Sequence, residues 1–302
     1  MKRLYEHQQV LVHKRLNQDN TWWTSACIPS DYAAMSQRHY IEQFYPLVRD
    51  LSIRRAPILM GPRRVGKTVM IFHCIQQLLQ EGIAARKIIY ISIDTPIYSN
   101  YELEELFHLA TQALSDKGEP AGYYVFFDEI QYLKDWEVHL KSLVDTYRQC
   151  KFVASGSATA TLKMKSRESG AGRFSDFSLP PLTFFEYITF IKAQGLLTAG
   201  ATLADWSCLD IEQLNRHFVN YINYGGYPEV VFSQSAQNNP DQFILNDIVD
   251  KVLLRDLPSL YGISDIQELN RLFMYIAFRS GSEFSYESLS VDAGLSKESL
   301  KK

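Results

Sequence analysis

Residues 61–68 read Gly61-Pro62-Arg63-Arg64-Val65-Gly66-Lys67-Thr68, which fits the phosphate-binding pattern G-x-x-x-x-G-K-[ST]. The two glycines let the backbone wrap closely around an anion, with successive N–H groups pointing inward. A helix that begins at Lys67 would face the phosphates with the positive end of its dipole. Lys67 can then reach the β and γ phosphates, and the Thr68 hydroxyl can ligate Mg²⁺. The stretch therefore predicts a cradle for the phosphates of a nucleotide.

The residues on either side of this loop supply the strand and the helix that it needs. An apolar run at 56–60 precedes the loop and is suited to a buried parallel strand. Apolar residues recur at helical spacing from Val69 to Leu79, and Gly82 follows where a helix would be capped. Because the motif works between a strand and a helix, this context favours a phosphate loop over a surface turn rich in glycine and arginine.

Strand-like and helix-like segments continue to alternate along the chain. Apolar, β-rich runs occupy residues 87–93, 123–127 and 151–155, with a weaker run at 177–179. Helical spacing occupies residues 101–117 and 136–149. This alternation predicts an α/β fold of the P-loop NTPase type, a three-layer αβα arrangement with a parallel sheet and right-handed crossovers.

After Pro181 the pattern becomes mostly helical, starting with a helix predicted over 184–194. We therefore divide the chain into an N-terminal extension (residues 1–37), a phosphate-loop domain (38–190) and a mostly helical region (191–302). Within the extension, residues 6–16 have helical character. We expect Trp22 and Trp23 to pack against the rest of the protein.

The composition excludes only a few classes of protein. The 302 residues carry a formal net charge of −3, which does not support nucleic-acid binding through a global basic field, although a local basic patch remains an alternative. Four scattered cysteines, without a C-x-x-C pair, indicate reduced thiols rather than a zinc site or a disulfide framework. The N-terminus lacks the apolar core of a signal peptide, and no apolar run approaches membrane-spanning length. We expect a cytoplasmic protein without a membrane span.

A second chemical signal is the run Val125-Phe126-Phe127, which ends in Asp128 and Glu129. A buried strand here would deliver Asp128 at the carboxyl edge of the sheet, where open α/β sheets bind ligands. Asp128 can then hold the Mg²⁺ shell, and Glu129 can orient or deprotonate an attacking water. The alternative is the acidic start of a helix, which the phosphate loop upstream disfavours.

Two weaker signals come later in the chain. Ser155 and Ser157 end the next strand, where a small hydroxyl could hydrogen-bond the attacking water or the γ-phosphate; the alternative is a turn with helix-capping serines. Arg173 precedes the last predicted strand and could stabilise charge that develops on the phosphate. The alternative for Arg173 is a solvated surface arginine.

Together these stretches resemble a group of prokaryotic AAA+-type P-loop ATPases whose C-terminal region is called DUF4143. The resemblance covers roughly residues 38–302, and its phosphate-site motifs are specific. The matching stretches are Gly61 to Thr68, Phe127-Asp128-Glu129-Ile130-Gln131, Ser155-Gly156-Ser157, Ala171-Gly172-Arg173-Phe174, Leu182-Thr183-Phe184-Phe185-Glu186-Tyr187, Tyr224-Gly225-Gly226-Tyr227-Pro228-Glu229 and Leu254-Arg255-Asp256. The resemblance implies a Walker A motif at 61–68, a Walker B motif at Asp128 and Glu129, and a sensor at Ser155 or Ser157.

Two features depart from that group. Many AAA+ proteins have Asn or Thr at the sensor position, where this chain has serine. The chain also ends at Lys302 within a predicted helix-turn-helix, with a first helix at 286–293, a turn at 294–296 and a second helix from 297. Either the sequence is truncated there or the gene is short. The second helix could contact DNA, but we prefer the alternative of a protein-interaction unit.

ATP is the expected nucleotide, because the chain has no N-K-x-D stretch of the kind that reads guanine. The first hypothesis is Mg²⁺-dependent ATP binding and hydrolysis that drives a conformational switch of the C-terminal helical region. The alternative is a nucleotide-gated module that binds DNA or a protein partner and hydrolyses slowly. A kinase is disfavoured, because Asp128 and Glu129 supply a water-activating pair and no site for a substrate hydroxyl is visible. The resemblance also suggests a homo-oligomer, in which Arg173 or Arg255 would complete the site.

Overall fold

The structure is a computed structural model. It describes residues 2–114, 120–157, 172–198, 207–224, 226–243 and 265–295, with a few shorter pieces between 245 and 263 and residue 300. The chain divides into two compact units, residues 1–234 and 235–302.

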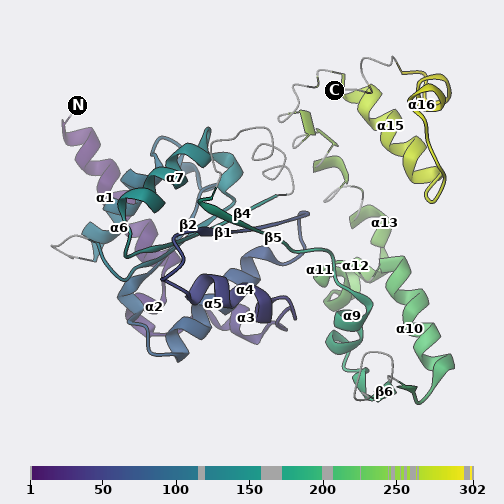
Figure 1. Cartoon of the computed structure of the whole chain (residues 1–302), viewed down its shortest axis with the longest axis horizontal. Helices are drawn as coiled ribbons and strands as arrows, with labels where there is room; N and C mark the ends of the chain where they lie inside the picture. The colour runs from purple at the N-terminus through teal and green to yellow at the C-terminus, as the bar shows by residue number, and fades with distance from the viewer. Residues whose placement is uncertain are drawn as a thin grey trace. The chain divides into compact units, whose positions relative to one another are not determined.

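The centre of the first unit is a five-stranded parallel sheet (Figure 1). Its strands are β1 (Ala56–Gly61), β2 (Ile88–Ser92), β3 (Tyr124–Asp128), β4 (Lys151–Ser157) and β5 (Phe174–Ser178). They lie in the order β2-β3-β4-β1-β5. Thus β4 lies between the strand that leads into the phosphate loop and the strand that ends in Asp128. The predicted α/β fold of the P-loop NTPase type is confirmed.

The inner strands form where the sequence is continuously apolar. Every residue of β1, β3 and β4 is buried, as expected for strands covered on both faces. The edge strand β5 is only partly buried and begins at Phe174, earlier than the run at 177–179 predicts. Ser175 and Asp176 interrupt its apolar pattern because an edge strand has an exposed side.

Helices cover both faces of the sheet (Figure 1). On one face lie α4 (Ile41–Arg49) and α5 (Lys67–Gln80), and on the other lie α6 (Leu103–Ala113) and α7 (Trp136–Thr146). The predicted helix after the phosphate loop begins at Lys67, and Gly82 follows its end with a positive φ of 84°. One α-helix follows each of the strands β1, β2 and β3, and these helices on both faces of the sheet produce the predicted three-layer arrangement.

The N-terminal segment covers the outer edge of β2. It forms α1 (Lys2–Asp19), α2 (Trp22–Ser25) and α3 (Ser30–Ala34), and α1 packs against β2 and α6. Both indole N–H groups of Trp22 and Trp23 donate to the Ile88 carbonyl, at 3.0 and 2.7 Å. The Asn20 amide donates to the Tyr90 carbonyl at 2.9 Å and accepts from the Tyr90 N–H at 2.6 Å. The two tryptophans are therefore packed, as predicted.

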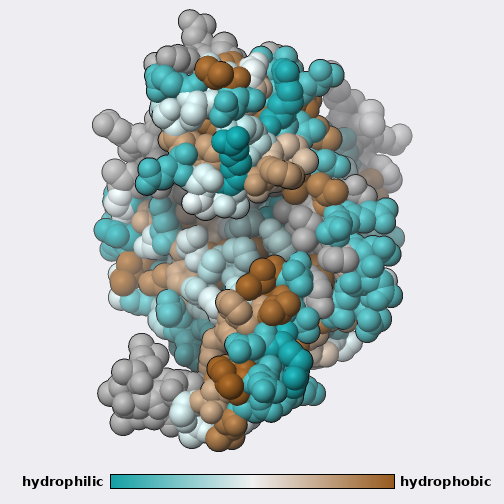
Figure 2. All heavy atoms as spheres, turned by 90° about the vertical axis from the view of Figure 1, so that its right-hand side faces the viewer, coloured by the Kyte–Doolittle hydropathy of each residue, from teal (hydrophilic) through white to brown (hydrophobic). Residues whose placement is uncertain are grey.

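The rest of the first unit is mostly helical and has a small core of its own. After β5 the chain forms α9 (Phe184–Phe190), the short antiparallel strands β6 (Leu197–Thr198) and β7 (Ser207–Cys208), α10 (Ile211–Tyr224) and α11 (Pro228–Phe232). The buried residues that share this core are Leu182, Tyr187, Ile188, Phe190 and Val231. Apolar side chains at and around α10 also remain exposed, and Figure 2 shows apolar surface among hydrophilic residues on this side.

Two helices dominate the described part of the second unit, α15 (Ile266–Phe278) and α16 (Tyr286–Asp292). The short helices α12 (Gln234–Asn238) and α13 (Pro240–Phe243) precede them. The Tyr275 hydroxyl of α15 donates to Asp292 of α16 at 2.5 Å. The predicted first helix of the helix-turn-helix corresponds to α16, and most of the predicted second helix lies outside the described residues. No helix in the described ranges is long and apolar enough to cross a membrane.

Candidate nucleotide-binding site

The phosphate loop joins β1 to α5. Glycine is required at positions 61 and 66 for two different steric reasons. A Cβ atom on Gly61 would lie 2.2 Å from the Leu179 carbonyl oxygen, so no larger residue fits beside this backbone. Gly66 has a φ of +94°, in the left-handed region that favours glycine. The non-glycine residue Arg64 also has a positive φ, of 63°. The loop is thus tightly curved between the end of the strand and the first residue of the helix.

Lys67 lies buried inside this loop. Its ammonium donates to the carbonyl oxygens of Gly61 at 3.1 Å and Pro62 at 2.9 Å. The loop therefore surrounds a positive charge, at the start of a helix whose dipole favours anions at this end. This is the arrangement that the sequence predicts for a phosphate cradle.

Thr68 and Asp128 meet where the carboxyl ends of β1 and β3 lie near each other. The Thr68 hydroxyl donates to Asp128 Oδ2 at 2.7 Å, and the Asp128 side chain is buried. A hydroxyl and a carboxylate are the hard oxygen ligands that Mg²⁺ prefers, so these two residues fit the metal. The part of the chain that the structure describes contains no group of three or more His, Cys, Asp or Glu that could hold a metal. Water and phosphate oxygens would supply the other ligands.

Asp128 is held by hydrogen bonds to both of its carboxylate oxygens. Oδ2 also accepts from the Tyr90 hydroxyl at 2.9 Å. Oδ1 accepts from the Ser155 hydroxyl and, at 3.1 Å, from the Glu129 N–H. Ser155, a predicted sensor, therefore contacts the carboxylate in this structure. Because β4 lies beside β3, Ser155 reaches Asp128 directly.

Glu129, the predicted base, follows Asp128 and has a positive φ of 54°. The Gln131 amide donates to its carboxylate, and Gln131 Oε1 also accepts from the Ser157 N–H at 3.1 Å. Burial raises the pKa of Glu129, while the nearby charge of Lys67 opposes that rise. A raised pKa brings a carboxylate closer to the range in which it exchanges protons near neutral pH.

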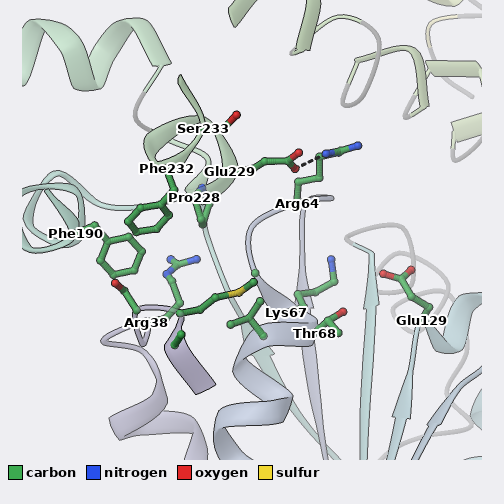
Figure 3. A pocket seen from close by; sticks show the side chains of 15 residues that line it. Arg38, Arg64, Lys67, Thr68, Glu129, Phe190, Pro228, Glu229, Phe232 and Ser233 are labelled. Carbon is green, nitrogen blue, oxygen red and sulfur yellow. Dashed lines mark hydrogen bonds and ion pairs between the residues drawn. The ribbon is translucent and has the colours of Figure 1, made fainter. Parts of the chain in front are cut away.

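A cavity of about 700 Å³ opens beside the loop (Figure 3). Gly66, Lys67, Thr68 and Glu129 line its polar end. The remaining lining residues are Ala34, Met35, Ser36, Arg38, Arg64, Val69, Phe190, Pro228, Glu229, Phe232 and Ser233. The rings of Phe190 and Phe232 stack at a centroid distance of 5.4 Å and form an apolar wall. A polar end beside an apolar wall fits a molecule with charged groups at one end and a flat ring at the other.

Arg38 was not predicted as a site residue, but it joins the loop to the helical part of the first unit. Its guanidinium forms a buried two-pronged ion pair with Glu186, with N–O distances of 2.8 and 3.0 Å. It also donates to the carbonyl oxygens of Val65 at 2.5 Å and Pro180 at 2.9 Å. No local sequence pattern around Arg38 predicts that it links the loop to the helical part, because Glu186 and Pro180 lie far from it along the chain.

Arg64 makes a second link from the loop to the helical part. It forms an ion pair with Glu229 of α11 (Figure 3). Pro228 also lies close to the loop, since a Cβ atom on Gly66 would be 3.9 Å from Pro228 Cγ. Pro228 and Glu229, from the stretch Tyr224 to Glu229 that the sequence singled out, thus line the cavity. Gly225 lies outside the described residues.

Arg173 does not join these residues. It precedes β5 at the amino end of the sheet, where Phe174 pairs with Ala56, whereas the phosphate loop follows the carboxyl end of β1. Its guanidinium pairs with Asp145 at 2.5 Å. In its own chain Arg173 therefore lies at the opposite end of the strands from the phosphate loop. The second candidate arginine, Arg255, and its neighbour Asp256 lie outside the described residues, as does Ala171.

The parallel sheet, the phosphate loop and the Thr68–Asp128 contact define a P-loop nucleotide-binding fold. Residues 54–188 match a family described as "AAA domain", which supports the AAA type expected from the sequence. Residues 215–302 match a different family, described as "Domain of unknown function (DUF8612)". The expected DUF4143 region is thus not shown by these matches.

The chain is also similar to two longer proteins, each named only as uncharacterised. It is 26% identical over 254 residues to one from Methanocaldococcus jannaschii, covering 83% of this chain and 53% of that protein. It is 24% identical over 249 residues to one from Haemophilus influenzae, covering 82% and 57%. The chain therefore spans little more than half the length of these relatives.

Among solved structures, the chain is similar to the ORC2 protein of Aeropyrum pernix, in ADPNP–ADP complexes. The TM-score is 0.47 at 14% identity, with 85% of this chain and 78% of that chain covered. It is also similar to AMPPCP-bound DnaA of Aquifex aeolicus, with a TM-score of 0.37 at 12% identity and coverage of 89% and 88%.

Proposed function

We propose that this chain binds ATP together with Mg²⁺ and hydrolyses it, and that hydrolysis switches the conformation of the C-terminal helical region. The observation that carries this proposal is the contact between Thr68 and Asp128 at 2.7 Å, beside a phosphate loop that holds a buried lysine. The match of residues 54–188 to an AAA domain supports it.

In the proposed reaction, the polar residues of the site have separate roles. Lys67 would leave its loop carbonyls for the β and γ phosphates, and Thr68 and Asp128 would hold Mg²⁺, which neutralises phosphate charge when bound. Glu129 would accept a proton from the water that attacks the γ-phosphorus. The bond between that phosphorus and the oxygen it shares with the β-phosphate breaks, and ADP and phosphate leave.

The apolar part of the cavity is suited to the nucleotide base. Met35, Phe190, Pro228 and Phe232 line this part. An aromatic and aliphatic wall accepts the flat face of a purine. Binding pockets of this kind are mostly apolar and use only a few polar groups to orient the ligand. Adenine is proposed because the chain lacks the guanine-reading stretch described above.

The first test of ATP binding is Lys67→Ala. Charge-assisted hydrogen bonds contribute about 1.5–3 kcal/mol each, so we expect ATP affinity to fall by about 10- to 100-fold. A titration of a fluorescent ATP analogue measures the affinity, and release of phosphate measures the turnover. Lys14→Ala, which removes an exposed lysine of α1, is the matched control. Equal affinity and turnover in Lys67→Ala and the parent would contradict the phosphate-loop assignment.

The second candidate function is a nucleotide-gated module that binds DNA or a protein partner and hydrolyses slowly. The observation that favours it is α16, which begins with a capping box at Ser285 and coincides with the predicted first helix of a helix-turn-helix. Measuring turnover with and without duplex DNA separates the two functions. Fast turnover that DNA leaves unchanged supports the first, and slow turnover with nucleotide-dependent DNA binding supports the second.

A further inference from the structure

We propose that Tyr90 is a positioning residue for the metal site, and that its hydroxyl holds the Asp128 carboxylate in the orientation in which this carboxylate and Thr68 bind Mg²⁺. This inference rests on the proposed function. Tyr90 lies on β2, and no pattern in the sequence distinguishes it from an ordinary core residue of that strand.

The first step of the argument is the number of donors around Asp128. Oδ2 accepts from Tyr90 at 2.9 Å and from Thr68 at 2.7 Å. Oδ1 accepts from Ser155 and from the Glu129 N–H. Two donors on each oxygen fill the lone pairs of an ionised carboxylate. Rotation of the carboxylate away from this position would break several of these bonds in a buried site.

The second step is what happens to these donors when a metal binds. In P-loop proteins the loop threonine turns its hydroxyl oxygen to Mg²⁺. Oδ2 would then lose the Thr68 donor, and the lone pair that accepted from it would become available to the metal. Tyr90 would keep its bond to the same oxygen. Its hydroxyl therefore limits the directions in which Asp128 can turn once Thr68 has left.

The third step is that Tyr90 is itself held firmly. Asn20 binds both its backbone N–H and its carbonyl, at 2.6 and 2.9 Å. Its ring lies 4.9 Å from the ring of Phe72 on α5, and Phe72 stacks on Tyr32 at 4.0 Å. A group that orients a metal ligand has to be this rigid.

Strand register explains why a long side chain is needed at this position. Asp128 pairs across the sheet with Ser92, while Tyr90 pairs with Phe126, two residues earlier on β3. A hydroxyl must therefore reach forward along the strand to meet the carboxylate. The tyrosine ring spans this distance, and phenylalanine would fill the same space without the oxygen atom.

The test compares Tyr90→Phe with Tyr98→Phe. Each change removes one hydroxyl from a buried tyrosine that donates to an aspartate, but the Tyr98 hydroxyl binds Asp19, at 3.3 Å. The assay uses Mn²⁺ in place of Mg²⁺, together with a non-hydrolysable ATP analogue. Electron paramagnetic resonance measures the free Mn²⁺, from which the Mn²⁺ affinity of each variant follows. A fluorescent ATP analogue in EDTA reports affinity without a metal, and thermal unfolding reports stability.

Loss of a residue that orients a metal ligand typically weakens metal affinity by about 10- to 100-fold. We expect a loss of about 10-fold for Tyr90→Phe, with analogue affinity in EDTA and Tm equal to those of Tyr98→Phe. Mn²⁺ affinity that is unchanged, increased or equally reduced in both variants would overturn the role of Tyr90 alone. A parent chain that binds neither ATP analogue nor Mn²⁺ would overturn the proposed function and this inference with it.

Discussion

Glu129 combines an unusual backbone conformation with an unusual carboxylate. A positive φ in a residue other than glycine costs on the order of 1 kcal/mol or more and persists only where the surroundings enforce it. Here the Glu129 N–H donates to Asp128 and Ser155, at 3.1 and 3.3 Å, and these bonds fix the backbone. Burial raises the pKa of the carboxylate. The folded chain therefore holds a strained, partly desolvated acid at the point where the proposed hydrolysis needs a water-activating base.

At this scale the prediction concerns Glu129→Gln. The amide keeps the shape and loses the base, so we expect MgATP to bind as before while turnover falls by about 100-fold or more. In the parent, turnover should fall on acidification at a pH above the ordinary glutamate value of 4.5, because the pKa is raised. Phosphate release across pH 4.5–8 measures both effects, with Glu212→Gln on α10 as an exposed control.

The same raised pKa has a consequence for stability with a definite sign. The folded state binds the Glu129 proton more tightly than the unfolded chain does, so ionised Glu129 destabilises the fold at pH values above its folded pKa. Glu129→Gln should therefore unfold at pH 7 with a Tm equal to or above that of the parent. A lower Tm, or turnover equal to the parent's, would contradict this view of Glu129.

Some residues of the proposed phosphate site could be identified from the sequence, and others could not. Lys67, Thr68, Asp128 and Glu129 could be predicted because their chemistry is tied to fixed spacing at strand ends. Tyr90 could not, because a tyrosine in a β-rich run is indistinguishable from a packed core residue.

At the scale of elements, the Arg38–Glu186 ion pair connects the phosphate loop to α9. Glu186 is also the third helical residue of α9, where it completes a capping box with Thr183. Burial alone would raise the pKa of Glu186, but Arg38 and the N–H groups of Thr183 and His39 lower it overall. The ion pair therefore stabilises the fold above the ordinary glutamate pKa, and this stability is lost as the pH falls through the lowered value.

The prediction for this link uses Arg38→Met and the double variant Arg38→Met/Glu186→Leu. The single change leaves a buried carboxylate without its cation and should destabilise the fold by about 3–5 kcal/mol. The double change removes both charges and should recover much of that loss. ATP affinity should stay low in both variants, because the Val65 carbonyl of the loop has lost its donor. Thermal unfolding and analogue titration measure the two effects, and full recovery of affinity in the double variant would show that Arg38 does not position the loop.

Strands and helices were predicted best where one physical factor dominates. The inner strands are continuously apolar because both of their faces are buried. The helix predicted over 184–194 ends at Phe190, and Lys192 soon afterwards takes a positive φ of 59°. Lysine does not favour the left-handed conformation, so the end of α9 at Phe190 could not be predicted from the sequence.

At the scale of the whole molecule, the position of Arg173 decides what an arginine finger would require. Arg173 lies at the amino end of β5, and the phosphate loop follows the carboxyl end of β1. If Arg173 acts on a phosphate, it has to act on the site of a second copy of the chain. Its exposed ion pair with Asp145 contributes little to stability, so the residue can be removed without unfolding the protein.

This model predicts that ATPase activity per subunit rises with protein concentration. Arg173→Ala should bind ATP and hydrolyse it poorly, whereas Arg148→Ala, an exposed arginine after α7, should behave as the parent. Mixing Arg173→Ala with Glu129→Gln chains should restore part of the activity, because some interfaces then combine an intact arginine with an intact base. Activity that stays flat on dilution, in a protein that remains monomeric with ATP, would refute the model.

The contacts that cover the outer side of β2 also protect the chain from self-association. A bare edge strand is a template on which other chains can add strands, which leads to aggregation. The Asn20 amide carries the same donor and acceptor as a peptide unit and occupies both backbone groups of Tyr90, and the two indoles occupy the Ile88 carbonyl. In a crowded solution, a foreign strand would have to displace these three side chains before it could pair with the sheet at this edge.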